Sequence, residues 1–505
     1  MKRILYIIFS AVLVLNFGAC SDDFLEVESS DRLFVDDYYN SESRIFEALV
    51  AAYDPLTWFD YAWGQYNHLG MISDIMSDDV YVGGSGPDDQ SYLHMMFNYN
   101  AHPTQVCSDL WTVFYSGVNR SNIVLKYMDN AVDITEENKA LYTAEAKVLR
   151  AFYYNWLWKL WGNVPYYEQN LEFPYTHEQN SADEVYEKTV VNIEDAIKNG
   201  GLPMRCSSEW NGRVTLAMAY MLYAEMVMYQ KDQDRYAQAL QYMEELYNSP
   251  DYSLVEDYAS IWEESGEWSS ESIFEINYFS NGGQRAWDNA LGDGGSVYPK
   301  LIGINALSGS PDFEGGWGFE PVRESAYEAY DPQDERRDAN ILNFEVYSAE
   351  TGASRTPRYQ DEGYFLRKYL PRVGGNANHS GNADMNYNNN FRVYRLAETA
   401  LNAAELIARG VTGAEKSADF YLTEVRKRAG LDPIEPTVDN ILKERRFELF
   451  GEGKRYWDLI RSGKAVEKLV PGEYRTNSWT ENKKYLPIPQ SEMDASPSTL
   501  TQNPY

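Results

Sequence analysis

The sequence predicts a mainly α protein in which helices from both ends of the chain form a scaffold and long aromatic loops lie between them. The first observation is one long helical pattern over residues 135–167. The second is a set of further helical segments with recognisable start and stop signals. The third is that the intervening segments are rich in Gly, Asn, Tyr and Trp. Binding surfaces usually lie on loops that a rigid scaffold supports, so we expect the function to reside in these loops.

The long helix has clear ends. Thr135 can cap its N-terminus, Gly162 supplies a stop, and Pro165 prevents continuation. Its apolar residues recur at helical spacing and form one stripe: Leu141, Ala144, Val148, Phe152, Trp156 and Leu160. A second stripe lies beside the first, so the helix is expected to be buried on more than one side. Its aromatic residues are interpreted as core, and the helix as scaffold.

Other segments also have helical patterns. They are 42–53, 109–128, 181–198, 213–230, 235–247, 324–330, 391–409, 414–429, 438–450 and 454–462. Ser181 and Glu184 form a capping-box pattern at the start of one of them. Paired helices with small residues such as Ala237 and Ala239 resemble tetratricopeptide units, although no repeat is visible as self-similarity of the sequence.

Three segments, 58–103, 250–321 and 374–390, are predicted as loop regions. Aromatic residues make up 15% of the chain, with 41 Tyr and 13 Trp, and many of them fall in the first two segments. Tyr and Trp combine an apolar face with a polar tip, which suits stacking on sugar rings. The alternative, an aromatic core, accounts for most of them. The candidate exposed ligand-binding residues are Trp287, Tyr298, Trp317, Tyr81 and Tyr92.

The N-terminus has the features of a targeting segment. Lys2 and Arg3 precede an apolar run that is too short to span a membrane, which is typical of a signal peptide over residues 1–19. Small residues before Cys20 resemble the lipobox of bacterial lipoproteins, which implies lipidation of Cys20; an ordinary secretory cleavage site is the alternative. The acidic residues after Cys20 resemble the surface-export signal of Bacteroidetes lipoproteins. Residues 20–41 are predicted to be an acidic tether.

The composition argues against several functions. The formal net charge is −33, so nucleic acid is not an expected partner, because phosphate binding needs a basic surface. No stretch after the signal peptide is apolar for long enough to be a transmembrane helix. After Cys20 only Cys107 and Cys206 remain; they could pair in an oxidising compartment, but they offer no zinc-binding spacing.

No pattern for catalysis is present. The sequence has no HExxH, GxSxG, P-loop or CxxC motif, and its five His residues show no ligand spacing. We therefore expect no catalytic residue, no cofactor and no metal site, with calcium in the Asp- and Asn-rich loops as an open alternative. A glycoside hydrolase needs two carboxylates at a fixed separation, a geometry that the sequence neither favours nor excludes.

Six motifs in order resemble the SusD/RagB family of outer-membrane nutrient-binding lipoproteins. They are 144–154 with 162–165, 181–186, 316–321 with Asp334 and Arg336-Arg337, 395–405, 444–459, and 486–490 with 502–505. The charged residues of the fifth motif are interpreted as structural ion pairs on closing helices, not as catalytic groups: Arg445, Arg446, Glu448 and Arg455.

The resemblance implies a scaffold of four tetratricopeptide-like helix pairs, covered on one side by a loop-rich ligand-binding region. Parts 42–250 and 251–505 are expected to fold together as one unit. The implied function is a cell-surface lipoprotein, held to the outer membrane by lipid on Cys20. It would capture oligosaccharides and deliver them to a SusC-like TonB-dependent transporter. A peptide-capturing member of the family and a surface glycoside hydrolase are the alternatives.

Overall fold

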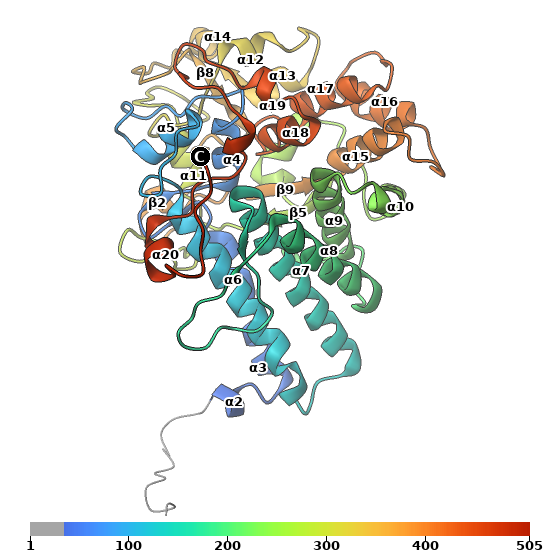
Figure 1. Ribbon diagram of the computed structural model, residues 1–505. Helices are drawn as coiled ribbons and strands as arrows, with labels where there is room; N and C mark the ends of the chain where they lie inside the picture. Colours follow the sequence, from blue (N-terminus) through green and yellow to red (C-terminus); the bar gives the residue numbers. More distant parts are fainter. Residues whose placement is uncertain (1–34) are drawn as a thin grey trace, which may run out of the picture.

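Helices that follow one another in the sequence pack side by side in the computed structural model, which describes residues 35–505. The scaffold helices are α3 (Glu42–Tyr53), α6 (Ser108–Tyr127), α7 (Glu136–Trp161), α8 (Ala182–Asn199), α9 (Leu216–Gln230), α10 (Tyr236–Tyr247), α15 (Leu396–Ala408), α16 (Ala418–Arg428), α17 (Val438–Glu448) and α18 (Arg455–Ser462). Four pairs can be followed in Figure 1: α3 with α6, α7 with α8, α9 with α10, and α15 with α16. The predicted mainly helical fold is confirmed.

The ends of the scaffold helices are formed by the residues that the sequence indicates. The Thr135 side chain accepts a hydrogen bond of 3.1 Å from the backbone N–H of Asn138 at the start of α7. Gly162 ends this helix with a φ of +69°, and a Cβ there would collide with the ring of Tyr485. At the start of α8, Ser181 and Glu184 form the predicted capping box.

Short antiparallel strands connect distant parts of the chain. The strands are β1 (Tyr61–Ala62), β2 (Gln65–Tyr66), β3 (Val164–Pro165), β4 (Gln179–Asn180), β5 (Ser272–Ile276), β6 (Pro321–Val322), β7 (Ile341–Asn343), β8 (Tyr364–Leu366) and β9 (Phe391–Arg395). Within residues 35–505 they pair as β1–β2, β3–β4, β5–β9 and a three-stranded sheet in the order β6–β8–β7. The buried pair β5–β9 places Ile276 opposite Phe391, at the point where the loop-rich region meets the scaffold.

Three element predictions were wrong, and one of them is the predicted loop 250–321, which contains strand β5 and helix α11 (Tyr298–Ile302). The predicted loop 58–103 contains the β1–β2 hairpin and the short helices α4 (Leu69–Ile75) and α5 (Ser91–Phe97). The predicted helix 391–409 begins as strand β9, whose sequence FRVYR is rich in residues that favour strands, and becomes helical only at Leu396. All five residues of β9 are buried, so tertiary pairing with β5 decides its conformation.

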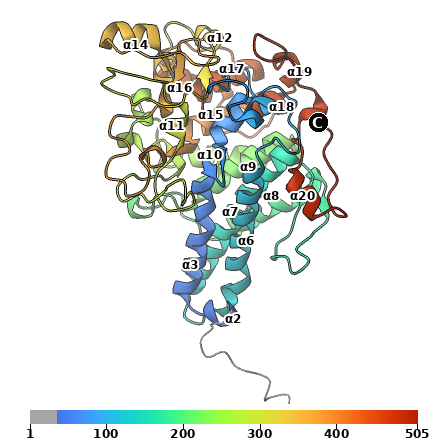
Figure 2. The same cartoon turned by 90° about the vertical axis from the view of Figure 1, so that its left-hand side faces the viewer.

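The remaining helices are short: α2 (Val35–Tyr38), α11 (Tyr298–Ile302), α12 (Glu324–Glu328), α13 (Arg336–Asn340), α14 (Phe344–Thr351), α19 (Ala465–Lys468) and α20 (Gln490–Ala495). Figure 2 shows the segment that carries α11, α12 and α14 on one side of the upright helices α3, α6 and α7. A small second core, which includes Phe313 and Leu342, lies within this segment. Among the described residues, no helix is long and apolar enough to cross a membrane.

The predicted signal peptide and Cys20 lie outside the described residues. In the described part of the predicted tether, α2 is followed by Tyr39, whose ring stacks on Tyr127 at 5.1 Å, so the tether joins the body before residue 41. One hydrophobic core includes residues from both 42–250 and 251–505. Cys107 is buried, Cys206 is half-buried, and both are free thiols.

Candidate functional site

Four aromatic rings meet at the surface where the β1–β2 hairpin contacts two loops. Tyr61 and Tyr66 come from the hairpin, and Trp287 and Trp317 come from loops more than two hundred residues later. The centroid distances are 5.1 Å for Tyr61–Tyr66, 5.4 Å for Tyr61–Trp287, 5.6 Å for Tyr66–Trp317 and 5.9 Å for Trp287–Trp317. The contacts close into a cycle, which we call the four-ring cluster. Trp287 is 43% exposed and the other three rings are half-buried, so part of the cluster faces solvent.

The hairpin places its two tyrosines opposite each other. Tyr61 pairs with Tyr66 in the antiparallel register, and directly opposed residues of such a pair share one face. The turn consists of Trp63 and Gly64, with φ values of +47° and +130°. Two-residue hairpin turns with positive φ match the twist of the strands, and glycine accepts this conformation readily. Two consecutive turn residues therefore fix the spacing of the tyrosines.

A buried ion pair holds the Trp287 loop against the hairpin. Trp287 lies at the tip of a tight turn closed by the backbones of Ala286 and Asn289. Arg285 comes directly before this turn. One of its guanidinium nitrogens lies 2.9 Å and 3.1 Å from the two carboxylate oxygens of Asp60. The other terminal nitrogen donates to the carbonyl oxygen of Tyr61 at 3.0 Å. Because both charged side chains are buried, the pair needs its partners, and the turn cannot move away from the hairpin without cost.

The Trp317 loop lies against the backbone of α11. The backbone N–H of Trp317 donates to the carbonyl oxygen of Lys300 at 3.0 Å. The backbone N–H of Gly318 donates to the carbonyl oxygen of Gly303 at 2.8 Å. A Cβ on Gly316 would lie 2.3 Å from the carbonyl oxygen of Lys300. Real Cβ atoms do not approach backbone this closely, so only glycine at this position lets the loop pack as it does. Trp317 is thus positioned by backbone contacts on both sides.

Partly exposed charged groups lie near the rings. Burial, the largest cause, raises the pKa of Tyr66, and Tyr61, Asp89 and Asp384 raise it further. Asp384 forms an ion pair of 3.1 Å with Lys300. Arg358 donates to the carbonyl oxygen of Trp317. Apolar ring faces with hydrogen-bonding groups beside them are the arrangement that binds polar ring-shaped ligands such as sugars.

Two of the five predicted ligand-binding residues lie in the cluster and three do not. Trp287 and Trp317 come together, although whether they bind ligand stays a prediction. The expectation that Tyr298, Tyr81 and Tyr92 are exposed was wrong, since all three are buried. Tyr298 is 2% exposed; its ring stacks on His68 at 3.6 Å and its hydroxyl donates to Glu320 at 2.8 Å.

Of the other two buried tyrosines, Tyr92 supports the four-ring cluster from below, whereas Tyr81 bonds elsewhere. The Tyr92 hydroxyl accepts the backbone N–H of Tyr66 at 2.8 Å and donates to the carbonyl oxygen of the same residue at 2.9 Å. It therefore fixes strand β2 without facing solvent. Tyr81 lies under the guanidinium of Arg323 and donates its hydroxyl to Glu362 at 3.0 Å. Sequence reasoning missed Tyr61 and Tyr66, because the Trp-Gly turn between them is not one of the dipeptides that signal a hairpin.

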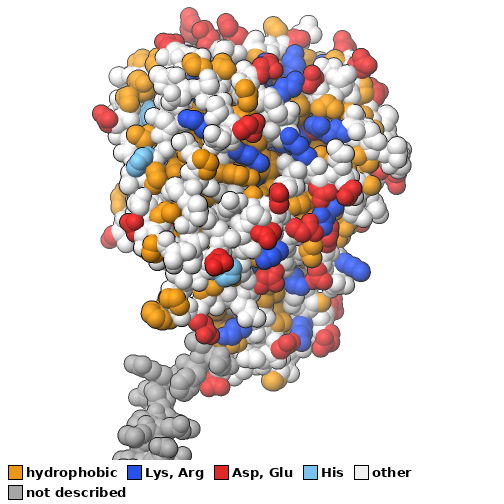
Figure 3. Space-filling model, in the orientation of Figure 1, with side chains coloured by type: hydrophobic (Ala, Val, Ile, Leu, Met, Phe, Trp, Pro, Cys, Tyr) orange, Lys and Arg blue, Asp and Glu red, His pale blue; other side chains and the backbone are white. Residues whose placement is uncertain are grey.

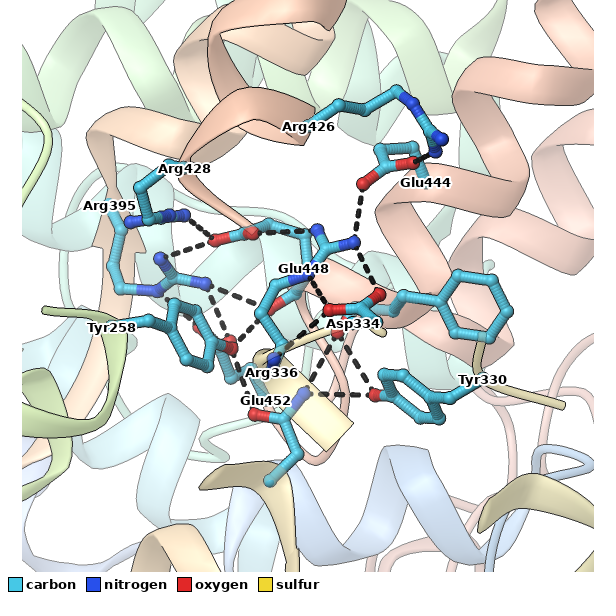
Figure 4. A network of polar contacts seen from close by, with 12 residues as sticks. Tyr258, Tyr330, Asp334, Arg336, Arg395, Arg426, Arg428, Glu444, Glu448 and Glu452 are labelled. Carbon is cyan, nitrogen blue, oxygen red and sulfur yellow. Dashed lines mark hydrogen bonds and ion pairs between the residues drawn. The ribbon is translucent and has the colours of Figure 1, made fainter. Parts of the chain in front are cut away.

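The conspicuous charges of the sequence motifs form a buried network instead of a reactive site (Figure 4). Arg336 lies 3.0 Å from Glu448, and Arg395 contacts both Glu448 at 3.0 Å and Glu452 at 2.8 Å. Burial raises the pKa of Glu448, but Arg428, Arg395 and Arg336 outweigh it and hold the pKa well below its ordinary value. Every charge in this group faces an opposite charge, so its role is to join α13, β9 and α17.

The other motif charges also form structural ion pairs. Arg446 and Arg455 bind Asp79 and Asp78, which lie between α4 and α5, and so connect the closing helices with the N-terminal part. Arg445 lies 2.8 Å from Asp458 on the next helix. The structural interpretation of these residues is confirmed. Residues 35–505 contain no group of three or more His, Cys, Asp or Glu side chains that could hold a metal ion.

The fold and this surface define a class of protein: a paired-helix scaffold that presents a rigid aromatic surface on loops. Comparison with known proteins gives the family. A family model described as "SusD family" matches residues 270–505, and one described as "Starch-binding associating with outer membrane" matches residues 23–228. The chain belongs to the SusD family.

Solved structures of relatives cover nearly the whole chain. Surface glycan-binding protein A from Bacteroides thetaiotaomicron is 51% identical, with a TM-score of 0.89 over 93% of this chain and 100% of that chain. The same protein in complex with laminarihexaose superposes with a TM-score of 0.88 over 92% of this chain and 100% of that chain. A laminarin binding SusD-like protein is 32% identical, with a TM-score of 0.83 over 92% of this chain and 100% of that chain.

Proposed function

We propose that the protein captures oligosaccharides of the laminarin type on its four-ring cluster and does not cleave them. The observation that carries the proposal is that three distant chain segments are fixed so that Tyr61, Tyr66, Trp287 and Trp317 share one partly exposed surface. Similarity to a glycan-binding protein solved with laminarihexaose supports the choice of ligand. Sugar rings would stack on the tryptophans while their hydroxyls bond to the charged groups nearby.

Calorimetry tests the proposal. The mature chain lacking Cys20 is titrated with laminarihexaose, laminarin, unrelated polysaccharides and mixed peptides, and each mixture is analysed for breakdown products. We expect saturable binding of laminarihexaose without products. Peptide binding alone would favour the peptide-capturing alternative, and released products would favour a hydrolase.

A matched pair of tryptophan variants locates the site. Trp287 and Trp210 are 43% and 44% exposed, but Trp210 lies on a different surface, beside Phe46 and Arg213. We expect Trp287→Ala to weaken laminarihexaose binding about tenfold or more, because a desolvated stacking contact is worth roughly 1.4 kcal/mol or more. Trp210→Ala should bind like the wild type. Equal losses in both variants would contradict the assignment of the site.

We further propose that the protein is held to the outer membrane by lipid on Cys20 and delivers its ligand to a SusC-like TonB-dependent transporter. The lipobox-like sequence before Cys20 and membership of the family support this. Cys20→Ala should move the protein from the membrane fraction to the soluble fraction of cells. Gentle solubilisation of membranes should recover the wild-type protein together with a TonB-dependent transporter. Recovery without such a transporter would contradict the delivery step.

A further inference from the structure

A second aromatic surface lies along α6, away from the four-ring cluster. A cavity of about 420 Å³ opens between α6, the loop over 165–177 and α20, and we call it the α6 groove. In Figure 1 this loop hangs at the lower left, and Figure 3 shows hydrophobic side chains at the same place on the surface. Two aromatic side chains of the loop, Phe173 and Tyr175, are exposed. Tyr175 is 69% exposed and lines the groove, whereas Phe173 is 85% exposed and does not line it.

The aromatic part of the α6 groove is held in place before any ligand arrives. The rings of Tyr115 and Tyr167 stack at 5.8 Å with an angle of 14° between their planes. The hydroxyl of the buried Tyr154 accepts the backbone N–H of Tyr167 at 2.9 Å and donates to its carbonyl oxygen at 3.0 Å. Tyr92 holds Tyr66 in the four-ring cluster by the same pair of bonds. Two surface tyrosines are thus fixed in the same way by buried tyrosines.

The charges of the groove favour a neutral ligand. Its one arginine, Arg120, is already paired with Asp54 at 2.6 Å. Burial raises the pKa of Glu492, which disfavours a negative charge at this position. The chain has a net charge of −33, and a groove whose arginine is already paired does not attract an anion. Polar side chains that line the groove, such as Ser116 and Asn119, suit hydroxyl groups.

A chain of contacts joins the groove to the four-ring cluster. The Arg120 guanidinium lies 4.8 Å from the ring of Trp58, and Trp58 contacts Trp63 at 6.3 Å. Trp63 is exposed at the turn of the hairpin that carries Tyr61 and Tyr66. Trp58 is buried, so these contacts join the exposed Trp63 of the hairpin turn to the half-buried Arg120 of α6 beneath the surface.

From this arrangement we propose that the α6 groove is a second carbohydrate-binding site, which engages the part of a long neutral polysaccharide that extends beyond the four-ring cluster. The proposal rests on the proposed function. It gives the protein a footprint longer than a single oligosaccharide, so that long chains are retained in preference to short ones.

The test compares ligand lengths in matched variants. Laminarihexaose and high-molecular-weight laminarin are titrated into the wild type, Tyr175→Ala and Phe173→Ala. We expect Tyr175→Ala to weaken binding of the polymer about two- to tenfold while leaving the hexaose affinity unchanged, because one stacking contact is lost. Phe173→Ala should match the wild type with both ligands. Both side chains are well exposed, so both variants should fold, as thermal unfolding will verify.

The outcomes separate the two proposals. If the wild type binds both ligands and Tyr175→Ala binds the polymer as tightly as the wild type, the second site is refuted and the proposed function stands. If the wild type binds no glycan, the proposed function itself is refuted. A polymer affinity that falls equally in Phe173→Ala would show a general effect of the exposed loop tip and would also refute the groove. A residual polymer affinity in Trp287→Ala that disappears in the Trp287→Ala, Tyr175→Ala double variant supports it.

Discussion

The guanidinium of Arg285 and the carboxylate of Asp60 lie 2.9 Å apart in the protein interior and join the Trp287 turn to the β1–β2 hairpin. Asp60 also accepts hydrogen bonds from the Ser296 hydroxyl at 2.9 Å and from the Val297 N–H at 2.7 Å, just before α11. One carboxylate therefore positions the hairpin, the Trp287 loop and the helix that supports Trp317. The geometry of the cluster depends on this residue although it does not face solvent.

Replacing Asp60 should reduce stability and binding together. In Asp60→Asn the Arg285 charge stays buried without its anion, which typically costs about 3–5 kcal/mol. We expect urea unfolding to show a loss of this size and calorimetry to show weaker laminarihexaose binding. The control is Arg44→Ala, which removes a solvent-exposed pair with Glu47 and should change the urea midpoint little. If the free energy of unfolding of Asp60→Asn lies within about 1 kcal/mol of the wild-type value, the Arg285–Asp60 pair does not hold the site.

A methyl group at Gly316 should displace Trp317. The added Cβ would lie 2.3 Å from the carbonyl oxygen of Lys300, so the loop must shift, at a cost of about 1–3 kcal/mol. We expect Gly316→Ala to unfold at lower urea and to bind laminarihexaose more weakly. Gly472→Ala is the matched control, because nothing lies within 4 Å of the added Cβ. Unchanged ligand affinity in Gly316→Ala would show that Trp317 does not contribute.

Removing one buried hydroxyl below the cluster should weaken binding indirectly. Tyr92→Phe leaves the backbone N–H and carbonyl oxygen of Tyr66 without their partner, at a cost of about 1–3 kcal/mol. We expect both stability and affinity for laminarihexaose to fall. Tyr81→Phe removes a hydroxyl that bonds Glu362 instead, and it should leave the affinity unchanged. Equal affinities in the two variants would refute the supporting role of Tyr92.

The acid sensitivity of the scaffold should depend partly on Asp458. Burial raises the pKa of this carboxyl, but Arg445 and Arg461 outweigh it and lower the pKa from 3.8 to about 2. Because the folded pKa is the lower one, the stabilisation is complete above pH 3.8 and is lost as the pH falls through about 2. Its size is about 2 kcal/mol.

The measurement is urea unfolding between pH 7 and pH 2. The stability difference between the wild type and Asp458→Asn should be constant near neutral pH and should shrink as the pH falls from about 4 to about 2. Asp88→Asn, at an exposed position, serves as the control for the loss of one negative charge. A difference that does not vary with pH would mean that Asp458 titrates alike in the folded and unfolded chains.

Local signals explain which parts of the fold could be predicted. The ends of α7 and α8 follow from Thr135, Gly162 and the Ser181–Glu184 box, because caps act on adjacent backbone. Strand β9 was missed although FRVYR favours a strand, because its conformation is decided by pairing with β5, over a hundred residues away. Glu448 was predicted to form structural ion pairs because it lies beside apolar helix residues. Its partners Arg336, Arg395 and Arg428 were not predicted.

The candidate site was predicted only in part for a related reason. Trp287 and Tyr298 both lie in a Gly-rich segment, and composition treats them alike. Long-range packing separates them: Arg285 holds Trp287 at the surface, whereas Tyr298 stacks on His68 in the interior. Exposure of an aromatic residue depends on tertiary contacts that a single sequence does not reveal.

The orientation of the rings in the four-ring cluster limits the shape of what can lie on it. Trp287 and Trp317 are inclined by 32°, Tyr66 stands at 62° to Trp317, and Tyr61 stands at 89° to Trp287. Each ring contacts two others in the cycle, so a ring that turned to meet a flat chain would lose contacts with its neighbours. A flat, ribbon-like polymer touches one plane at a time, whereas a curved one follows several. On the proposed function, selection among polysaccharides is therefore made by curvature, before any individual hydroxyl group is recognised.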